Sequence, residues 1–153
     1  MISENVLVAL VTTGALFFAI FTMSTQQVSI LSPDERLTPI EAKSNIDSHS
    51  DKYLLIDVRP REQTDFSMIS KAIAIPLAEL QEGVGVAKVR QLLTADKAIK
   101  RVYVNCRRGN ASQRAVRLLK DNKVDVDNGV EIKDIIGGIE AWVAQVDPTL
   151  PLN

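Results

Sequence analysis

The segment that decides the fold runs from Val102 to Gln113 and reads VYVNCRRGNASQ. Its first residues, together with Arg101, form a short run of β-type residues, which predicts a buried strand. Cys106 follows directly, then a loop of charged residues, glycine and asparagine, and then a helical pattern that begins at Ser112. In open α/β sheets, ligands bind at the carboxyl ends of the parallel strands. The only cysteine of the chain is therefore expected at the edge of a sheet where binding sites occur.

Strand-type and helix-type segments alternate on both sides of this stretch. The expected strands cover residues 37–38, 53–58, 72–75, 101–105 and 130–136. The expected helices cover residues 39–46, 77–81, 84–95, 112–122 and 139–146, with a shorter one inside 59–68. Thr38 and Pro39 suit the start of the first helix, and Trp142 is expected to be buried by the last. Such alternation predicts a mainly parallel sheet of about five strands between two helix layers, a three-layer α/β/α sandwich.

The N-terminal part differs in composition from the rest of the 153-residue chain. Residues 6–23 form an uncharged run of 18, of which 14 are apolar, and a helix of that length spans roughly 27 Å, close to the bilayer core. The alternatives are a membrane anchor, a packed helix or tail foreign to the domain, and a cleaved signal. Residues 1–28 are assigned to this segment and its linker and residues 29–153 to the domain, with the polar linker character continuing from Ser24 to Arg36. The domain is expected to face the cytoplasm if it is anchored and to be cytosolic otherwise.

The composition excludes several classes of protein. Apolar residues make up 46% of the chain and charged residues 24%, which argues against a disordered chain. A formal net charge of −1 gives no basic excess, so nucleic-acid binding is not expected. One Cys and one His leave no structural zinc site and no internal disulfide framework. Neither a metal nor a cofactor is predicted.

Three features near Cys106 favour a thiolate, the nucleophilic form of cysteine. They are loop amides that point inward, the positive end of the following helix dipole, and the charges of Arg107 and Arg108. Gly109 allows the tight loop to adopt a positive φ. Ser112 either caps its helix or donates a hydrogen bond to an anionic sulfur. The alternatives are an inert buried cysteine and solvated surface arginines.

Three motifs in the right order resemble the rhodanese superfamily. They are Leu55–Arg59 (LIDVR), the Cys106 loop, and Ile136–Trp142 (IGGIEAW), and the resemblance covers roughly residues 30–153. It implies a rhodanese-like α/β fold and a sulfurtransferase that carries sulfur as a Cys106 persulfide. It also implies that Asp57 and Arg59 tie their strand to the neighbouring loops, an Arg59–Glu62 ion pair being the alternative. The loop residues that it assigns to substrate binding are Arg107, Arg108, Gly109, Asn110, Ala111 and Ser112.

Further stretches resemble one subgroup, the C-terminal rhodanese domain of adenylyltransferase–sulfurtransferase proteins. They are residues 32–38 (SPDERLT), residues 106–110 (CRRGN), Ser112–Gln113 and the tail around 141–151. Members of this subgroup convert a ubiquitin-like sulfur carrier to a thiocarboxylate, for tRNA thiolation or molybdopterin synthesis. The resemblance implies a sulfur donor, either a cysteine desulfurase or thiosulfate, and such a carrier as partners.

The sequence departs from this pattern in three places. It contains no Gly-rich nucleotide loop and no zinc-binding Cys pairs, so this chain is not expected to activate a carrier by itself; it acts in trans, is a fragment, or does something else. Ala111 stands where the subgroup usually has an acidic residue, which affects the preference for the sulfur donor. Residues 68–72 read MISKA where rhodaneses usually have His-Ile-Pro-Gly-Ala, so altered packing is expected there.

Two other functions compete with sulfur transfer. One is a rhodanese-fold binding module without turnover, tethered to a membrane through residues 6–23. The other is a different chemistry at Cys106, either that of a cysteine protease or that of a protein-tyrosine or arsenate-type phosphatase or reductase. His49, the only candidate base, is expected in an exposed loop at the amino end of the strand 53–58, whereas sulfur transfer needs no imidazole. A Cys-x5-Arg phosphatase would require Arg where this chain has Ser112, and the loop from Cys106 to Ala111 is a residue too short for that cradle.

Overall fold

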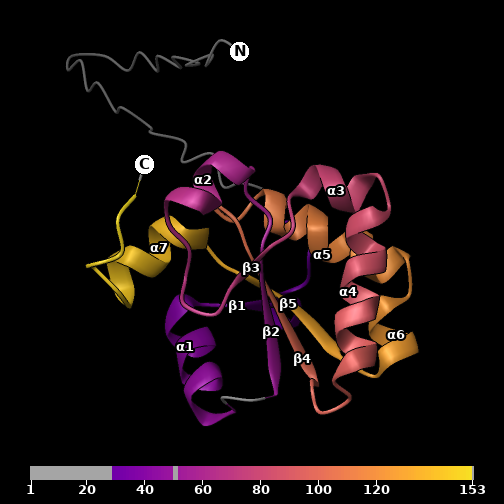
Figure 1. Cartoon of the computed structure of the whole chain (residues 1–153). Helices are drawn as coiled ribbons and strands as arrows, with labels where there is room; N and C mark the ends of the chain where they lie inside the picture. Colours follow the sequence, from indigo (N-terminus) through magenta and orange to yellow (C-terminus); the bar gives the residue numbers. More distant parts are fainter. Residues whose placement is uncertain (1–28, 50–51, 153) are drawn as a thin grey trace, which may run out of the picture.

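The computed structural model describes residues 29–49 and 52–152. Its centre is one five-stranded sheet in the order β1-β5-β4-β2-β3, and every neighbouring pair is parallel (Figure 1). The strands are β1 (Arg36–Leu37), β2 (Tyr53–Asp57), β3 (Ile73–Ala74), β4 (Arg101–Asn105) and β5 (Glu131–Ile135). The predicted fold class is confirmed, and the sheet is parallel throughout.

Helices cover both faces of the sheet (Figure 1). One face carries α1 (Pro39–Ser48) and α7 (Gly138–Gln145). The other carries α4 (Val84–Ala95), α5 (Ala111–Asp121) and α6 (Val124–Asn128). The short helices α2 (Arg61–Phe66) and α3 (Leu77–Gln81) lie near the carboxyl ends of β2 and β4.

The central strand β4 is buried on both of its faces. Val102 and Val104 pack into the core beneath α4 and α5, while Tyr103 packs into the core beneath α1 and α7, which includes Trp142. The predicted burial of Trp142 is confirmed, since it is 4% exposed. A strand that is covered on both sides reads as a continuous apolar run. The strand therefore ends at Cys106 in the interior of the molecule.

The linker predicted from Ser24 to Arg36 is wrong for its second half. The 3-10 helix η1 (Pro33–Glu35) lies there, and Leu31 is only 5% exposed. The Gln113 side chain on α5 accepts hydrogen bonds from the Ile30 N–H and the Ser29 hydroxyl, both at 3.0 Å. These partners lie more than 80 residues further along the chain, so the local sequence contains no sign of the ordering.

Other boundaries differ by one or two residues, and one helix was not expected. Helix α6 follows Lys123, which has a φ of 57°, and its sequence VDVDN shows no helical pattern. His49 ends α1 and is half-buried, so the expectation that it is solvent-exposed is wrong. Its expected place ahead of β2, at the amino end of that strand, is confirmed.

In the described part of the chain, no helix is long and apolar enough to cross a membrane. The candidate anchor at residues 6–23 lies outside the described residues. The same holds for the whole segment 1–28.

Candidate active site

Cys106 lies at the carboxyl end of β4, where its side chain is 2% exposed. The Gly109 N–H donates to its Sγ at 3.1 Å, and the Ser112 hydroxyl lies 3.1 Å from the same atom. Asn110 is the N-cap residue of α5, whose amino end lies directly behind the loop. The N-cap alternative for Ser112 is therefore wrong. Ser112 is fully buried inside the first turn, where its hydroxyl is free to contact the sulfur.

The loop after Cys106 rests on the turn between β5 and α7. The Ile139 N–H donates to the Cys106 carbonyl at 2.8 Å, and the Glu140 N–H donates to the Arg107 carbonyl at 3.2 Å. Gly138 has a φ of 61°, and a Cβ at this position would lie 2.6 Å from the Arg107 carbonyl carbon. Only glycine fits so close to another backbone, so this turn fixes the shape of the loop.

The arginines of the loop are not free cations. Arg107 Nε donates to a Glu140 carboxylate oxygen at 2.8 Å, and Arg108 Nε pairs with the other oxygen at 3.1 Å. The two guanidinium groups, Arg107 first, hold the pKa of Glu140 below its ordinary value. Both arginine side chains are exposed and line the cleft in front of Cys106. A ligand anion at this position would compete with Glu140 for them.

Asp57 and Arg59 form a buried ion pair beside the same edge of the sheet. Arg59 Nε and Nη2 donate to the two carboxylate oxygens of Asp57 at 3.0 and 2.8 Å, and Nη2 also donates to the Ser67 carbonyl. Asn105 Nδ2 bonds to Asp57 from β4 at 3.2 Å. The pair thus connects β2 with β4 and with the carboxyl end of α2, whose first residues line the cleft.

The cleft above Cys106 has a volume of about 670 Å³. Its apolar wall comes from the ends of β2 and β3 and from α3. Its charged residues come from the segment between β2 and α2, from α2 and α3, from the Cys106 loop and from α5. Asn110 and Ala111 line it as well. Its charged members are Arg59, Arg61, Glu62, Glu79, Glu82, Arg107, Arg108 and Arg114. Both signs of charge occur, so the cleft suits an extended polar ligand as well as a small anion.

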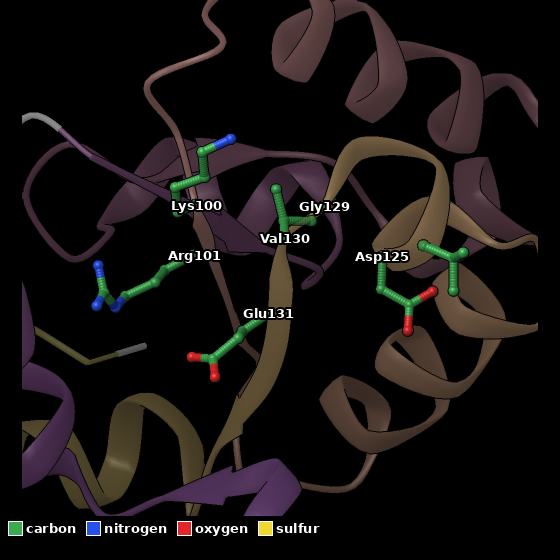
Figure 2. Close-up of a pocket in the computed structure, with 7 residues that line it drawn as sticks. Lys100, Arg101, Asp125, Gly129, Val130 and Glu131 are labelled. Atoms are coloured by element: carbon green, nitrogen blue, oxygen red, sulfur yellow. The ribbon is translucent and has the colours of Figure 1, made fainter.

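A second hollow of about 500 Å³ opens at the other end of the sheet (Figure 2). Arg101 and Glu131, the first residues of β4 and β5, line it together with Asp125 of α6. Because the strands are parallel, this hollow lies at their amino ends, opposite Cys106. The nucleophile and its loop belong to the cleft at the carboxyl edge alone.

The site contains residues that the sequence did not single out. Glu140 pairs with both loop arginines, Asn105 holds Asp57, and Asp134 is buried on β5. Gly138, which shapes the loop, did carry a local signal, since it is one of two adjacent glycines. The pair was interpreted as the end of the strand. The others make contacts across strands and helices, and such contacts leave no pattern in a single sequence.

A family model for the rhodanese-like domain matches residues 38–145, well over half of the chain. The chain belongs to the rhodanese-like domain family. Its relatives include "Adenylyltransferase and sulfurtransferase MOCS3" of Sus scrofa, which is 36% identical over 135 residues. "Adenylyltransferase and sulfurtransferase uba4" of Emericella nidulans is 33% identical over 156 residues. The alignments cover 82% and 92% of this chain but only 29% and 32% of those proteins.

Solved structures show the same fold. A rhodanese-related protein from Thermoplasma volcanium is 27% identical, with a TM-score of 0.55 over 78% of this chain and 99% of that one. The human single-domain sulfurtransferase TSTD1 is 21% identical, with a TM-score of 0.56 over 72% of this chain and 96% of that one. For TSTD1, with its lower identity, the likeness concerns the fold alone. The alignments cover nearly all of these two solved chains but only about a third of the longer relatives.

Proposed function

We propose that this domain is a sulfurtransferase in which Cys106 carries sulfur as a persulfide and passes it to a thiophilic acceptor. The observation that supports the proposal best is the setting of the Cys106 sulfur. It lies at the base of a cleft and has the Gly109 N–H and the Ser112 hydroxyl as hydrogen-bond partners. Donors of this kind stabilise a sulfur anion and leave one side of the atom open to the cleft.

The transfer has two balanced steps. The Cys106 thiolate attacks the outer sulfur of thiosulfate, the S–S bond breaks, and sulfite leaves with the bonding electron pair. The resulting persulfide carries its negative charge on the outer sulfur. An acceptor such as cyanide then attacks that sulfur, thiocyanate leaves, and the Cys106 thiolate returns. A cysteine desulfurase would supply the same persulfide by exchange with its own persulfide.

The acceptor that we propose is the C-terminal tail of a ubiquitin-like sulfur carrier. The relatives are named as joint adenylyltransferases and sulfurtransferases, and the cleft is larger than thiosulfate requires. This chain spans about a third or less of those relatives, so adenylylation of the carrier is assigned to another polypeptide or another part of the protein. We further propose residues 29–153 as the rhodanese domain and residues 6–23 as its membrane anchor.

Intact mass spectrometry after treatment with thiosulfate, or with a desulfurase and cysteine, tests this function. Wild-type protein should gain about 32 Da, one sulfur atom, which cyanide or a thiol removes. The Cys106→Ser variant should gain nothing. Its retention of full transferase activity would overturn the assignment. No adduct on wild-type protein with any donor would instead favour a binding module without turnover.

The same protein tests the anchor. Full-length protein should partition into detergent, and a variant that lacks residues 1–28 should stay in the aqueous phase. Equal partitioning of the two would contradict the anchor.

A further inference from the structure

Most arginines that line the cleft above Cys106 are already held by carboxylates of the same chain. Their ion pairs are Arg59–Asp57, Arg61–Glu79, Arg107–Glu140 and Arg108–Glu140. Among the residues that the structure describes, Arg114 is the one cleft arginine without an ion pair. A small anion that enters the cleft therefore meets guanidinium groups that are in large part engaged.

Glu140 holds two of these arginines at once and reaches them from outside the cleft. It lies on α7, whereas Arg107 and Arg108 belong to the loop after Cys106 and line the cleft. Arg107 Nε donates to Glu140 Oε1 at 2.8 Å, and Arg108 Nε lies 3.2 and 3.1 Å from the two carboxylate oxygens. All three side chains are at least one-third exposed, so the pairs are in contact with water. Exposed ion pairs are weak, and a ligand anion can replace the carboxylate.

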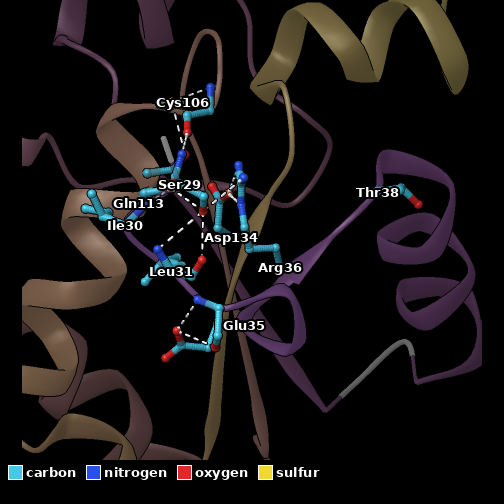
Figure 3. A network of polar contacts seen from close by, with 12 residues as sticks. Ser29, Ile30, Leu31, Glu35, Arg36, Thr38, Cys106, Gln113 and Asp134 are labelled. Atoms are coloured by element: carbon cyan, nitrogen blue, oxygen red, sulfur yellow. Dashed lines mark hydrogen bonds and ion pairs between the residues drawn. The ribbon is translucent and has the colours of Figure 1, made fainter. Parts of the chain in front are cut away.

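The backbone of the Cys106 loop is held independently of Glu140's carboxylate. Gln113 Nε2 donates to the Gly109 carbonyl at 2.6 Å, and the Ile139 N–H donates to the Cys106 carbonyl at 2.8 Å. Figure 3 shows Gln113 within the network of polar contacts that also includes Ser29 and Ile30. Removing the charge of Glu140 should therefore release the arginine side chains and leave the loop in place.

The two classes of sulfur donor differ in what they require from these arginines. Thiosulfate is a dianion, and its sulfonate oxygens bind best to cationic hydrogen-bond donors such as free guanidinium groups. A cysteine persulfide presents the same transferable sulfur without a sulfonate group. The carboxylate of Glu140 opposes the dianion in two ways, because it occupies both loop arginines and repels negative charge placed beside them.

We propose that Glu140 is a specificity-determining residue, which weakens the binding of small oxyanions such as thiosulfate by holding Arg107 and Arg108. The site then favours a sulfur donor that presents a persulfide. With such a donor the Cys106 thiolate attacks the outer sulfur, the S–S bond breaks, and the donor thiolate leaves with the bonding electron pair. The proton of the persulfide stays on the outer sulfur. The choice between sulfur donors rests on the proposed function, whereas the effect on anion binding does not.

Protection of Cys106 by sulfate tests the anion effect without any sulfur transfer. Sulfate is an unreactive dianion, and the alkylation of Cys106 by iodoacetamide is followed by intact mass as sulfate replaces chloride at constant, low ionic strength. Glu140→Gln keeps the size of the side chain and one acceptor oxygen but removes the charge. The sulfate concentration for half protection should be about tenfold lower in this variant than in wild type, and the difference should shrink as salt is added. Equal midpoints, or no protection of the variant by sulfate, would overturn the proposal.

Two further comparisons separate the loop arginines from the net charge of the protein. Asp121→Asn is the matched control, because it removes the same charge and frees Arg117, an exposed arginine on α5 that does not line the cleft. Its midpoint should differ from wild type by less than about twofold. A shift as large as that of Glu140→Gln would ascribe the effect to net charge and overturn the proposal.

The second comparison repeats Glu140→Gln in a background that carries Arg107→Gln and Arg108→Gln. If Glu140 acts through the two arginines, its substitution should now shift the midpoint by less than about twofold. A shift of about tenfold that persists without the arginines would contradict the proposed cause.

Transfer kinetics test the choice of sulfur donor. The ratio of kcat/KM for thiosulfate to kcat/KM for cysteine persulfide should rise about tenfold in Glu140→Gln, mainly through a lower KM for thiosulfate. An unchanged ratio would overturn the role in specificity. Because sulfate has no sulfur to transfer, the two proposals can fail separately. A persulfide adduct without a shift in the sulfate midpoint would remove the role of Glu140 and leave the sulfurtransferase, and a shift without any adduct would do the opposite.

Discussion

Two buried aspartates flank the strand that ends at Cys106, and they are bonded in different ways. Asp57 on β2 accepts from three Arg59 nitrogens and from Asn105, so both of its oxygens are satisfied. Asp134 on β5 uses one oxygen for Arg36, and among the described residues its other oxygen has no hydrogen-bond partner. A saturated pair fixes geometry, because moving it breaks several bonds at once. The Asp134–Arg36 pair is held by fewer bonds, so breaking it should cost less.

The largest expected effect comes from breaking the saturated pair. Asp57→Ala leaves the Arg59 guanidinium, in a side chain that is 3% exposed, without its partner. A buried charge that loses its partner destabilises a protein by about 3–5 kcal/mol. The free energy of unfolding, measured with urea, should fall by that amount.

Two controls sharpen this prediction. The double variant Asp57→Ala/Arg59→Met removes both charges and should recover part of the loss. Asp134→Ala should cost less than Asp57→Ala, since the Arg36 side chain is 16% exposed and can reach water. Equal losses at the two aspartates would contradict the distinction between the pairs.

The next largest effect is expected at the turn between β5 and α7. Gly138→Ala places a Cβ 2.6 Å from the Arg107 carbonyl carbon, which is backbone and cannot rotate away. A loss of about 2–4 kcal/mol is expected, together with slower alkylation of Cys106 as its loop shifts. Gly129→Ala is the matched control, because Gly129 has a φ of 61° but no atom within 4 Å of such a Cβ. It should cost only about 1 kcal/mol and leave alkylation unchanged.

A smaller effect distinguishes the pH dependence of two carboxylates near β5. Hydrogen bonds from Lys120 and Ser32 lower the pKa of Glu35 from 4.5 to about 2. Glu35 therefore stabilises the fold above pH 4.5, and this contribution is lost as the pH falls towards 2. The raised pKa of Asp134 has the opposite sign, since its contribution is lost as the pH rises through the folded-state value.

Glu35→Gln should therefore destabilise the protein at neutral pH by about 1 kcal/mol, a value reduced for solvent screening. The difference from wild type should shrink as the pH is lowered below 4 in urea titrations. Asp34→Asn, an exposed neighbour in η1, serves as the control and should change little. A Glu35→Gln deficit that stays constant down to about pH 2 would refute the linkage.

The smallest effect lies on the Asp57 side, just ahead of β3. Lys71 has a φ of 64°, at the position where the resembling rhodanese stretch has glycine. In the left-handed region a residue with a side chain is less stable than glycine by about 1–2 kcal/mol. Glycine has more conformational entropy in the unfolded chain, and this offsets part of the stabilisation that Lys71→Gly would bring. Lys71→Gly should stabilise the domain by about 0.5 kcal/mol, and Lys71→Ala should not. A thermal shift that is equal for both would show that the backbone is not the cause.

The sequence predicted the elements that have a strong periodic signal. Strands β2 and β4 and helices α4 and α5 were expected within one or two residues, because buried runs and amphipathic spacing are local properties. Helix α6 was missed because its five residues are too few to show a helical period. The segment 29–35 was assigned to the domain but interpreted as polar linker, because its order comes from Gln113 and Lys120 on a distant helix.

The sequence by itself determined that a strand would deliver Cys106 to the start of a helix at a sheet edge, since strand, loop and helix are consecutive in the chain. Only the tertiary structure decided what surrounds that sulfur. Arg36 meets Asp134 across 98 residues, and Glu140 reaches the loop arginines from a separate helix. Parallel strands bring such residues together through crossovers, and the register that pairs them is set by packing of the whole sheet.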